Sequence, residues 1–195
     1  MIKLIDILEN KILVPRRSPE ERSKNYLIAT QKKIQQYMKD GSKGNLDLSN
    51  TPITSLPQDL KVGGNLDLND TPITSLPQDL KVGGNLGLSG TKITSLPQGL
   101  TVGGYLDLQN TPITTLPQGL TVGGNLYLYG AKITSLPQGL TVKGNLDLRF
   151  TKITSLPQDL TVVGDLELGN TPISKKYTRE QIKQMIPGVK GRIST

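Results

Sequence analysis

The side chains that could do chemistry in this 195-residue chain are few, because it contains neither cysteine nor histidine. The absence of cysteine excludes disulfides, thiolate metal sites and cysteine nucleophiles. The absence of histidine removes the commonest general acid–base residue near neutral pH and the commonest metal ligand. The Gly-Gly pairs lack the Lys-Ser/Thr and the following helix of a phosphate-binding loop. We therefore expect no enzyme activity, no cofactor and no metal centre.

Acidic side chains recur at intervals of 20 residues. The column consists of Asp47, Asp67, Asp107, Asp147 and Glu167, with Gly87 and Tyr127 in the intervening places. If equivalent residues lie in register on strands about 4.8 Å apart, neighbouring carboxylates should repel each other. Such an acidic ladder could bind a cationic partner or a hard cation such as calcium. We favour the alternative, that these are solubilising surface residues copied along with a repeat.

The aromatic residues are concentrated in one part of the chain. Of the seven aromatics, four lie close together, with an arginine beside them: Tyr105, Tyr127, Tyr129 and Phe150, with Arg149. The four aromatics replace residues that are small or polar in most other copies of the repeat. Tyrosine and arginine are enriched in binding hot spots, and exposed aromatics need a reason. These five residues are our predicted partner-binding site; the alternative is drift at permissive surface positions.

A strict 20-residue repeat must position both sets of side chains. Full copies begin at Gly44, Gly64, Gly84, Gly104, Gly124 and Gly144, and a truncated seventh copy begins at Gly164 and loses the pattern after Ile173. No copy has an insertion or a deletion. Numbering each copy from its first glycine, the acidic column is position four, and positions two, four and six should share the outer face of one sheet. Self-similarity at this period is the signature of a solenoid.

The physics of one copy explains the period. Its six aliphatic positions are Leu46, Leu48, Ile53, Leu56, Leu60 and Val62. The first two and the last two alternate with other residues, as in strands with one buried face. Two Xaa-Pro steps turn the chain between them, and a Gly-Gly pair permits the corner to the next copy. One copy cannot bury six aliphatic side chains alone, whereas stacked copies can, so we predict a mainly β repeat solenoid.

The segment Leu46–Pro57, Leu-x-Leu-x-x-Thr-x-Ile-Thr-Ser-Leu-Pro, resembles the leucine-rich repeat, nearest to the short 20-residue Leu-Pro class of bacterial secreted effectors. The chain is also similar to uncharacterised repeat proteins encoded by bacteriophages, which share the Gly-Asn-Leu-Asp-Leu and Pro-Ile-Thr-Ser-Leu-Pro-Gln-Gly-Leu runs and a Ser-Lys-Lys-Tyr tail. The resemblance covers at least residues 44–177. It implies a leucine-rich-repeat-like solenoid that recognises a protein.

Two departures from that family affect the expectation. The family's buried turn asparagine is replaced by Thr51, Thr71, Thr91, Thr111, Thr151 and Thr171, and by Ala131. A leucine before the strand pair is replaced by Gly63 and its equivalents, which predicts a flatter curvature. A β-solenoid with two or three short sheets is therefore the alternative architecture. The ubiquitin ligases of the effector class use a cysteine in a separate domain, so that activity does not carry over.

The two ends differ from the repeats in charge and pattern. Residues 1–43 hold ten Lys or Arg against five Asp or Glu, and residues 174–195 hold six against one, whereas residues 44–173 hold seven against ten. We expect residues 1–43 to form an N-terminal helical cap, with a short helix near residues 2–9 and a longer one near residues 19–39. Ser18 with Glu21, and Thr178 with Gln181, have the spacing of capping boxes, which begin helices. Ile182, Met185 and Ile186 give residues 174–195 an apolar helical face, so this segment should form a helical cap and tail.

These features favour a non-enzymatic protein-interaction module that binds a host or viral protein. One alternative is a structural or self-assembling component of a virion or homo-oligomer, and another is nucleic-acid binding through the basic ends. A monomer and a homo-oligomer fit the sequence equally well, and no membrane partner is expected. We expect a cytoplasmic protein, in the host cytoplasm if the source is viral, with a virion component as the alternative.

Overall fold

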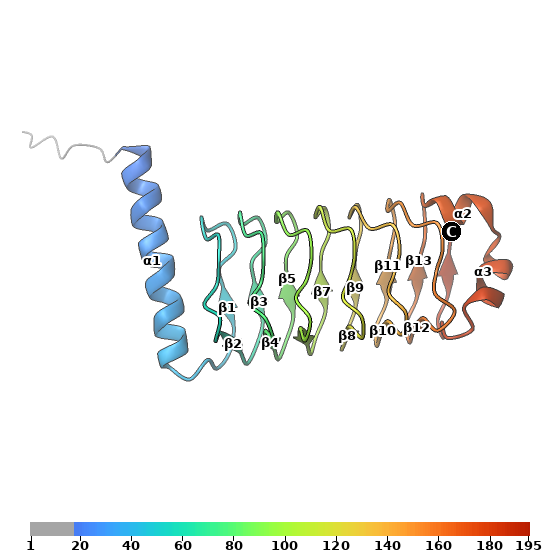
Figure 1. Ribbon diagram of the computed structural model, residues 1–195, viewed down its shortest axis with the longest axis horizontal. Coiled ribbons are helices and arrows are strands. Elements are labelled where there is room, and N and C mark those ends of the chain that lie inside the picture. The colour runs from blue at the N-terminus through green and yellow to red at the C-terminus, as the bar shows by residue number, and fades with distance from the viewer. Residues whose placement is uncertain (1–17) are drawn as a thin grey trace, which may run out of the picture.

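The computed structural model describes residues 18–195, which form a row of stacked coils between helices at the two ends (Figure 1). The predicted repeat solenoid, mainly β with short helices at its ends, is confirmed. Every full coil contributes two short parallel strands to two separate sheets, the arrangement that the sequence left as the alternative architecture.

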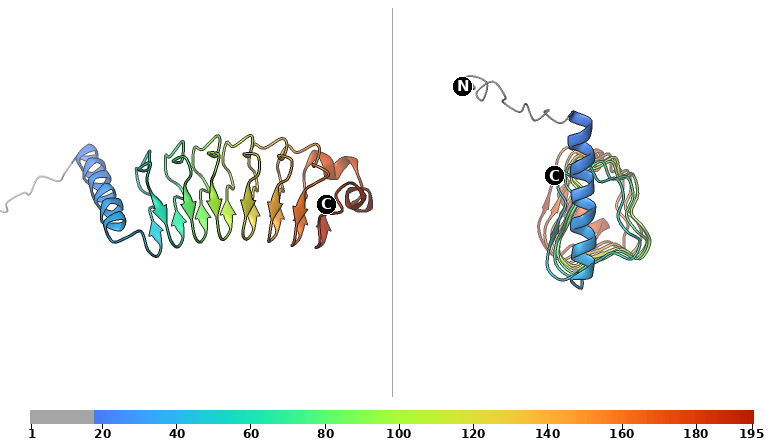
Figure 2. Two further views of the ribbon diagram at one scale, coloured as in Figure 1. Left: turned by 60° about the horizontal axis from the view of Figure 1, so that its bottom comes forward. Right: turned by 90° about the vertical axis from the view of Figure 1, so that its left-hand side faces the viewer.

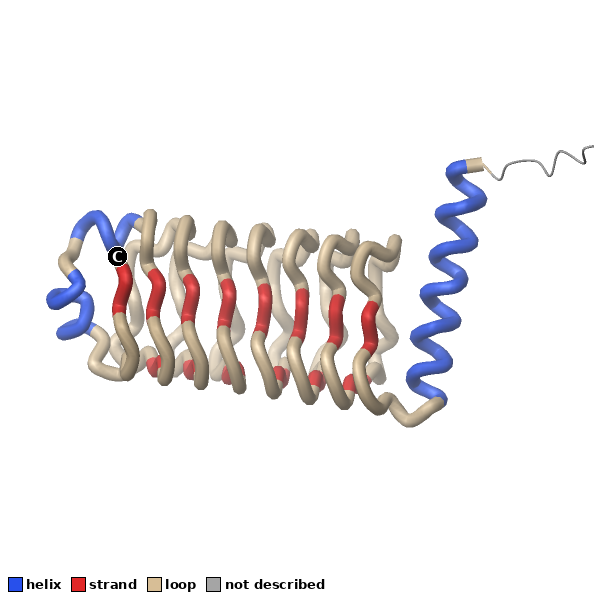
Figure 3. Tube along the Cα trace, turned by 180° about the vertical axis from the view of Figure 1, so that it is seen from behind, coloured by secondary structure: helices blue, strands red, loops and turns tan. Residues whose placement is uncertain are grey.

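The first sheet has eight strands, which face the viewer in Figure 3. They are β1 (Leu46–Asp47), β3 (Leu66–Asp67), β5 (Leu86–Gly87), β7 (Leu106–Asp107), β9 (Leu126–Tyr127), β11 (Leu146–Asp147), β13 (Leu166–Glu167) and β14 (Ile193–Ser194). The second sheet has six: β2 (Lys61–Val62), β4 (Lys81–Val82), β6 (Thr101–Val102), β8 (Thr121–Val122), β10 (Thr141–Val142) and β12 (Thr161–Val162). In the repeats the register advances by 20 residues per coil, so that Leu46 pairs with Leu66 and Lys61 with Lys81.

The core is a set of continuous aliphatic columns. The leucines that begin the first-sheet strands, from Leu46 to Leu166, are at most 2% exposed, and the valines of the second sheet at most 3%. Because equivalent side chains touch their own copies in the next coil, each column buries its members completely. At about 1.5–3 kcal/mol per buried aliphatic side chain, this stacking is what holds the coils together.

Two local features accompany the turn after the first strand of a coil. In every coil except the one with Ala131, the threonine at position eight donates its hydroxyl hydrogen to the carbonyl of the leucine three residues earlier, at 2.6 to 2.7 Å. This bond pairs the leucine carbonyl at the turn, in the place where the leucine-rich repeat, which the sequence resembles, has an asparagine. The residue at position seven has a φ between 55° and 69° in every coil. Six of these seven residues are Asn, Asp or Gly, the types that tolerate left-handed backbone.

Helix α1 (Pro19–Lys39) has the predicted bounds and the predicted capping box between Ser18 and Glu21. It crosses the open end of the first coil (Figure 2), where Thr30 and Ile34 are buried. The phenol oxygen of Tyr37 lies 2.8 and 2.9 Å from the carbonyl oxygens of Ser42 and Gly44, which share its one hydrogen, and this contact ties the helix to the first coil. The short helix expected near residues 2–9 lies outside the described residues.

The C-terminal segment closes the other end. Helix α2 (Pro172–Lys176) was not predicted, whereas α3 (Arg179–Met185) starts at the predicted capping box of Thr178 and Gln181. Ile182 and Ile186 are fully buried as expected, but Met185 is 38% exposed. None of the helices in residues 18–195 is long and apolar enough to cross a membrane.

Beyond α3 the chain returns to both sheets, and the sequence pattern did not predict this return. Val189 bridges to Val162 in the second sheet, and Ile193 pairs with Leu166 in the first. The run Val189-Lys190-Gly191-Arg192-Ile193 is thus a diverged copy of Val142-Lys143-Gly144-Asn145-Leu146, offset from its neighbouring coil by 27 residues instead of 20.

Candidate functional site

The outer face of the first sheet carries the acidic column at position four. The register places Asp47 beside Asp67 and Asp147 beside Glu167, as expected. The four aspartates of the column, Asp47, Asp67, Asp107 and Asp147, each accept a hydrogen bond from the backbone N–H two residues later, at 2.9 to 3.0 Å. The aspartate therefore has a local role, capping the N–H that follows the strand.

The column is not a continuous ladder of free charges. Asp147 is only 6% exposed, and Arg149 holds it through two bonds, from Nε at 3.0 Å and from Nη2 at 2.7 Å. Within residues 18–195, no three Asp or Glu side chains lie close enough to hold a metal ion together.

A second ladder runs along position two. The side-chain oxygen of each residue accepts the backbone N–H of its equivalent in the next coil, at 2.8 to 2.9 Å. The accepting residues are Asn45, Asn65, Asn85, Asn125, Asn145 and Asp165. The series breaks at Tyr105, which has no oxygen in reach of the Asn125 N–H.

The predicted aromatic residues meet on this face in two adjoining groups. The rings of Tyr105 and Tyr127 contact each other edge to face, with centroids 5.9 Å apart. The phenol oxygen of Tyr127 accepts a 2.6 Å hydrogen bond from Nδ2 of Asn125. Because these residues come from adjacent coils, the contact joins two rungs of the sheet.

The second group is built on Arg149. Its guanidinium carbon lies 5.6 Å from the ring centroid of Tyr129, within cation–π range. Tyr129 contacts Phe150 in turn, with centroids 5.0 Å apart. The two bonds from Arg149 to Asp147 fix the guanidinium and raise the pKa of Arg149, so the stacked cation is held in one orientation. We call Tyr105, Tyr127, Tyr129, Arg149 and Phe150 the aromatic stripe.

Three members of the stripe depart from the pattern of most other coils. Tyr105 interrupts the position-two ladder. Tyr127, like Gly87, lacks the carboxylate that caps the N–H two residues later. Phe150 occupies position seven with a φ of 59°, where the other coils have Asn, Asp or Gly. Each lost hydrogen bond costs about 0.5–1.5 kcal/mol, and left-handed backbone costs an aromatic residue about 1–2 kcal/mol. These three replacements therefore carry a structural cost.

A groove of about 200 Å³ adjoins the stripe. Its lining residues include Asn45, Asp47, Asn65, Asp67, Asn85, Gly87 and Tyr105. Burial, and then the charges of Asp107 and Asp67, raise the pKa of Tyr105. Burial also raises the pKa of Asp107, whereas the hydrogen bonds from Ser49 lower that of Asp47. The groove is suited to a cationic group.

Sequence reasoning named the five stripe residues but not Asn125, which orients Tyr127, or Gly87, which opens the groove. The replacement of aspartate by Gly87 between Asp67 and Asp107 of the acidic column was the available signal. A scan against models of known protein families found no match, and a search of curated proteins found no relative.

Proposed function

We propose that this protein is a non-enzymatic interaction module that binds a partner protein through the aromatic stripe. The observation that carries the proposal is that the residues that depart from the repeat pattern are concentrated in this stripe. Tyr105, Tyr127 and Phe150 each replace a residue with a structural role in the other coils, and all three contribute an aromatic ring to the same surface. Local structural cost at one surface site is typical of function.

The stripe and the groove together favour a particular partner surface. Phe150 and Tyr105 are 52% and 39% exposed, so they offer apolar area. The Arg149 guanidinium is already paired with Asp147, so it contributes a flat stacking surface more than a free charge. The groove beside Tyr105 adds carboxylates. A partner with an aromatic or aliphatic projection flanked by a lysine or arginine would complement both.

The repeat motif supports a finer assignment. We propose that the coils are leucine-rich repeats of the short Leu-Pro class and that the protein is related to bacteriophage-encoded repeat proteins, acting in the cytoplasm of a bacterial host. The support is the Leu-x-Leu-x-x-Thr-x-Ile-Thr-Ser-Leu-Pro pattern, with the position-eight threonine making the turn bond.

Affinity capture from a bacterial lysate, followed by a measured affinity for the captured protein, tests the proposal. Tyr127→Ala with Tyr129→Ala should weaken binding by about tenfold or more, since buried tyrosines dominate interface energies. Tyr26→Ala is the matched control, because Tyr26 is 49% exposed on α1, away from the stripe. An affinity changed less than about twofold in the double variant would contradict the proposal.

The same experiment separates the two alternative functions. Nucleic-acid binding through the basic ends predicts an affinity that falls steeply with salt and ignores the tyrosine substitutions. Self-assembly predicts a mass that rises with concentration in light scattering. Either result, with no loss of binding in the double variant, would replace the proposal.

A further inference from the structure

The end of the first sheet at β14 has a backbone edge whose hydrogen-bonding groups have no partner within residues 18–195. In each coil, the N–H of the leucine that begins the strand points to the following coil. Leu46 donates to Asn65, and Leu166 donates to Arg192, both at 2.8 Å. Ile193 is the equivalent of Leu166 in the last strand. Its N–H and C=O therefore point away from β13, to the side where a further rung would lie.

Side chains cover the comparable groups elsewhere. At the other end of the first sheet, the ammonium of Lys33 on α1 donates to the carbonyl of Asp47. At the last rung of the second sheet, Lys183 on α3 donates to the carbonyl of Val189. Within residues 18–195, no hydrogen bond reaches the N–H or the C=O of Ile193. Exposed strand edges are templates for pairing with another chain.

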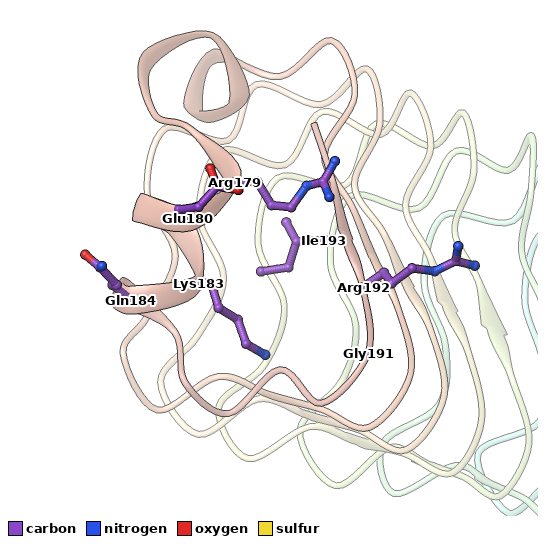
Figure 4. A pocket seen from close by; sticks show the side chains of 7 residues that line it. All are labelled: Arg179, Glu180, Lys183, Gln184, Gly191, Arg192 and Ile193. Atoms are coloured by element: carbon purple, nitrogen blue, oxygen red, sulfur yellow. The ribbon is translucent and has the colours of Figure 1, made fainter.

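A cavity lies directly beside this edge. It has a volume of about 400 Å³ and lies between α3 and β14, lined by Arg179, Glu180, Lys183, Gln184, Gly191, Arg192 and Ile193. In Figure 4, the side chains of Arg179 and Lys183 extend from the helix toward β14, on either side of Ile193. The helix therefore contacts β14 but leaves a cavity beside the backbone edge, which an extended chain could enter.

The charge of the lining selects the occupant. Two cations, Arg179 and Lys183, extend toward β14 beside the cavity, against one carboxylate, Glu180. The side chain of Arg192 is 90% exposed and extends away from α3, with Asp165 of the preceding coil 3.8 Å away. A second copy pairing through the same edge would bring the two basic linings together, and like charges across an interface oppose it. An acidic segment would be attracted.

We propose that the β14 edge accepts an extended acidic segment of a partner protein as an additional strand of the first sheet. Main-chain hydrogen bonds to Ile193 supply the pairing, as in other cases of β-strand addition, and Arg179 and Lys183 select for carboxylates. This surface is separate from the aromatic stripe, so the two proposals can fail independently.

The probe for this proposal is a labelled, end-capped peptide of alternating glutamate and valine, about seven residues long. Fluorescence anisotropy should show saturable binding. Arg179→Glu should weaken binding by about tenfold or more, because this cation extends toward β14 and the added strand. Lys190→Glu is the matched control. It makes the same change of charge at the same end, on an exposed residue outside the cavity lining, and should change the affinity by less than about twofold.

Two further measurements test the geometry. Ile193→Pro removes the outward N–H and should abolish binding, provided that thermal unfolding shows the variant to be folded. Amide exchange at Ile193 should slow when the peptide is bound. The Tyr127→Ala, Tyr129→Ala double variant should bind the peptide normally.

Three outcomes would overturn the proposal. A lysine-for-glutamate peptide that binds equally well would remove the role of charge. Binding without protection of the Ile193 amide would remove the strand pairing. A dimer at working concentration that Ile193→Pro dissociates would show that a second copy covers the edge.

Discussion

Coils one to three and coils four to six share the same core and period but differ in how they treat their outer face. In the first three, the amides of Asn45, Asn65 and Asn85 form an unbroken ladder. In the later three, Tyr105 breaks that ladder, Tyr127 displaces a capping aspartate, and Phe150 sits in left-handed backbone. The comparison separates two kinds of sequence constraint. Stacking fixes the interior residues of every coil. Aromatic side chains replace stabilising outer residues only in the aromatic stripe, the proposed partner-binding surface.

The core should respond alike in both regions, and this is the largest effect expected. Leu66→Ala and Leu106→Ala each remove a fully buried side chain from a closed column. Both should lower the free energy of unfolding by about 2–5 kcal/mol, measured by chemical denaturation. Costs that differed by more than about 2 kcal/mol between the two variants would mean that the two halves are not built on one core.

The glycine at position one should distinguish the intact ladder from the broken one. A Cβ on Gly104 would lie 2.1 Å from Oδ1 of Asn85, the atom that accepts the Tyr105 N–H, whereas a Cβ on Gly124 meets nothing closer than 3.0 Å. Gly104→Ala should therefore cost about 0.5–1.5 kcal/mol more than Gly124→Ala, the value of the lost hydrogen bond. Equal costs would show that the amide ladder contributes nothing.

Position seven tests whether the stripe is kept at a structural cost. Phe150→Asn places a tolerant residue in backbone with a φ of 59°. We expect the free energy of unfolding to rise by about 0.5–1 kcal/mol, since relief of left-handed strain exceeds the loss of an exposed ring contact. Partner affinity should fall. Asn110→Phe makes the reverse change in coil four and should destabilise; a stabilised Asn110→Phe would contradict the interpretation.

The smallest expected effects concern two aspartates of the same column. Burial raises the pKa of Asp107 above its ordinary value of 3.8, so ionisation costs stability as pH rises through the raised pKa. Asp107→Asn keeps the oxygen that accepts the Gln109 N–H and should raise the unfolding temperature at pH 7. The gain should vanish once the pH is below the ordinary pKa.

Asp47→Asn is the opposite case. Hydrogen bonds from Ser49 lower the pKa of Asp47, so its charge stabilises the fold above the ordinary pKa, and that contribution is lost as pH falls through the lowered one. The substitution should slightly lower the unfolding temperature at pH 7. Shifts of the same sign in Asp47→Asn and Asp107→Asn would contradict the assigned environments.

The sequence predicted what depends on period and local capping. The aliphatic columns, the bounds of α1 and the Thr178 capping box all follow from residue spacing, and the structure has each of them. It did not reveal the diverged coil at Val189–Ile193, because α3 shifts the offset to 27 residues and isoleucine replaces leucine. The local role of the aspartates and the Arg149–Asp147 pair were also missed, since both depend on side-chain geometry within the coil.

The constant register offset makes this protein modular in length. Each contact between neighbouring repeats joins residues 20 apart, so removing residues 64–83 would place Leu46 beside Leu86 with the same bonding pattern on either side of the junction. The shortened chain would keep both end structures and bring them closer by one strand spacing, about 4.8 Å. The separation between the aromatic stripe and α1 can therefore be changed in fixed steps by adding or removing whole repeats, without redesigning either.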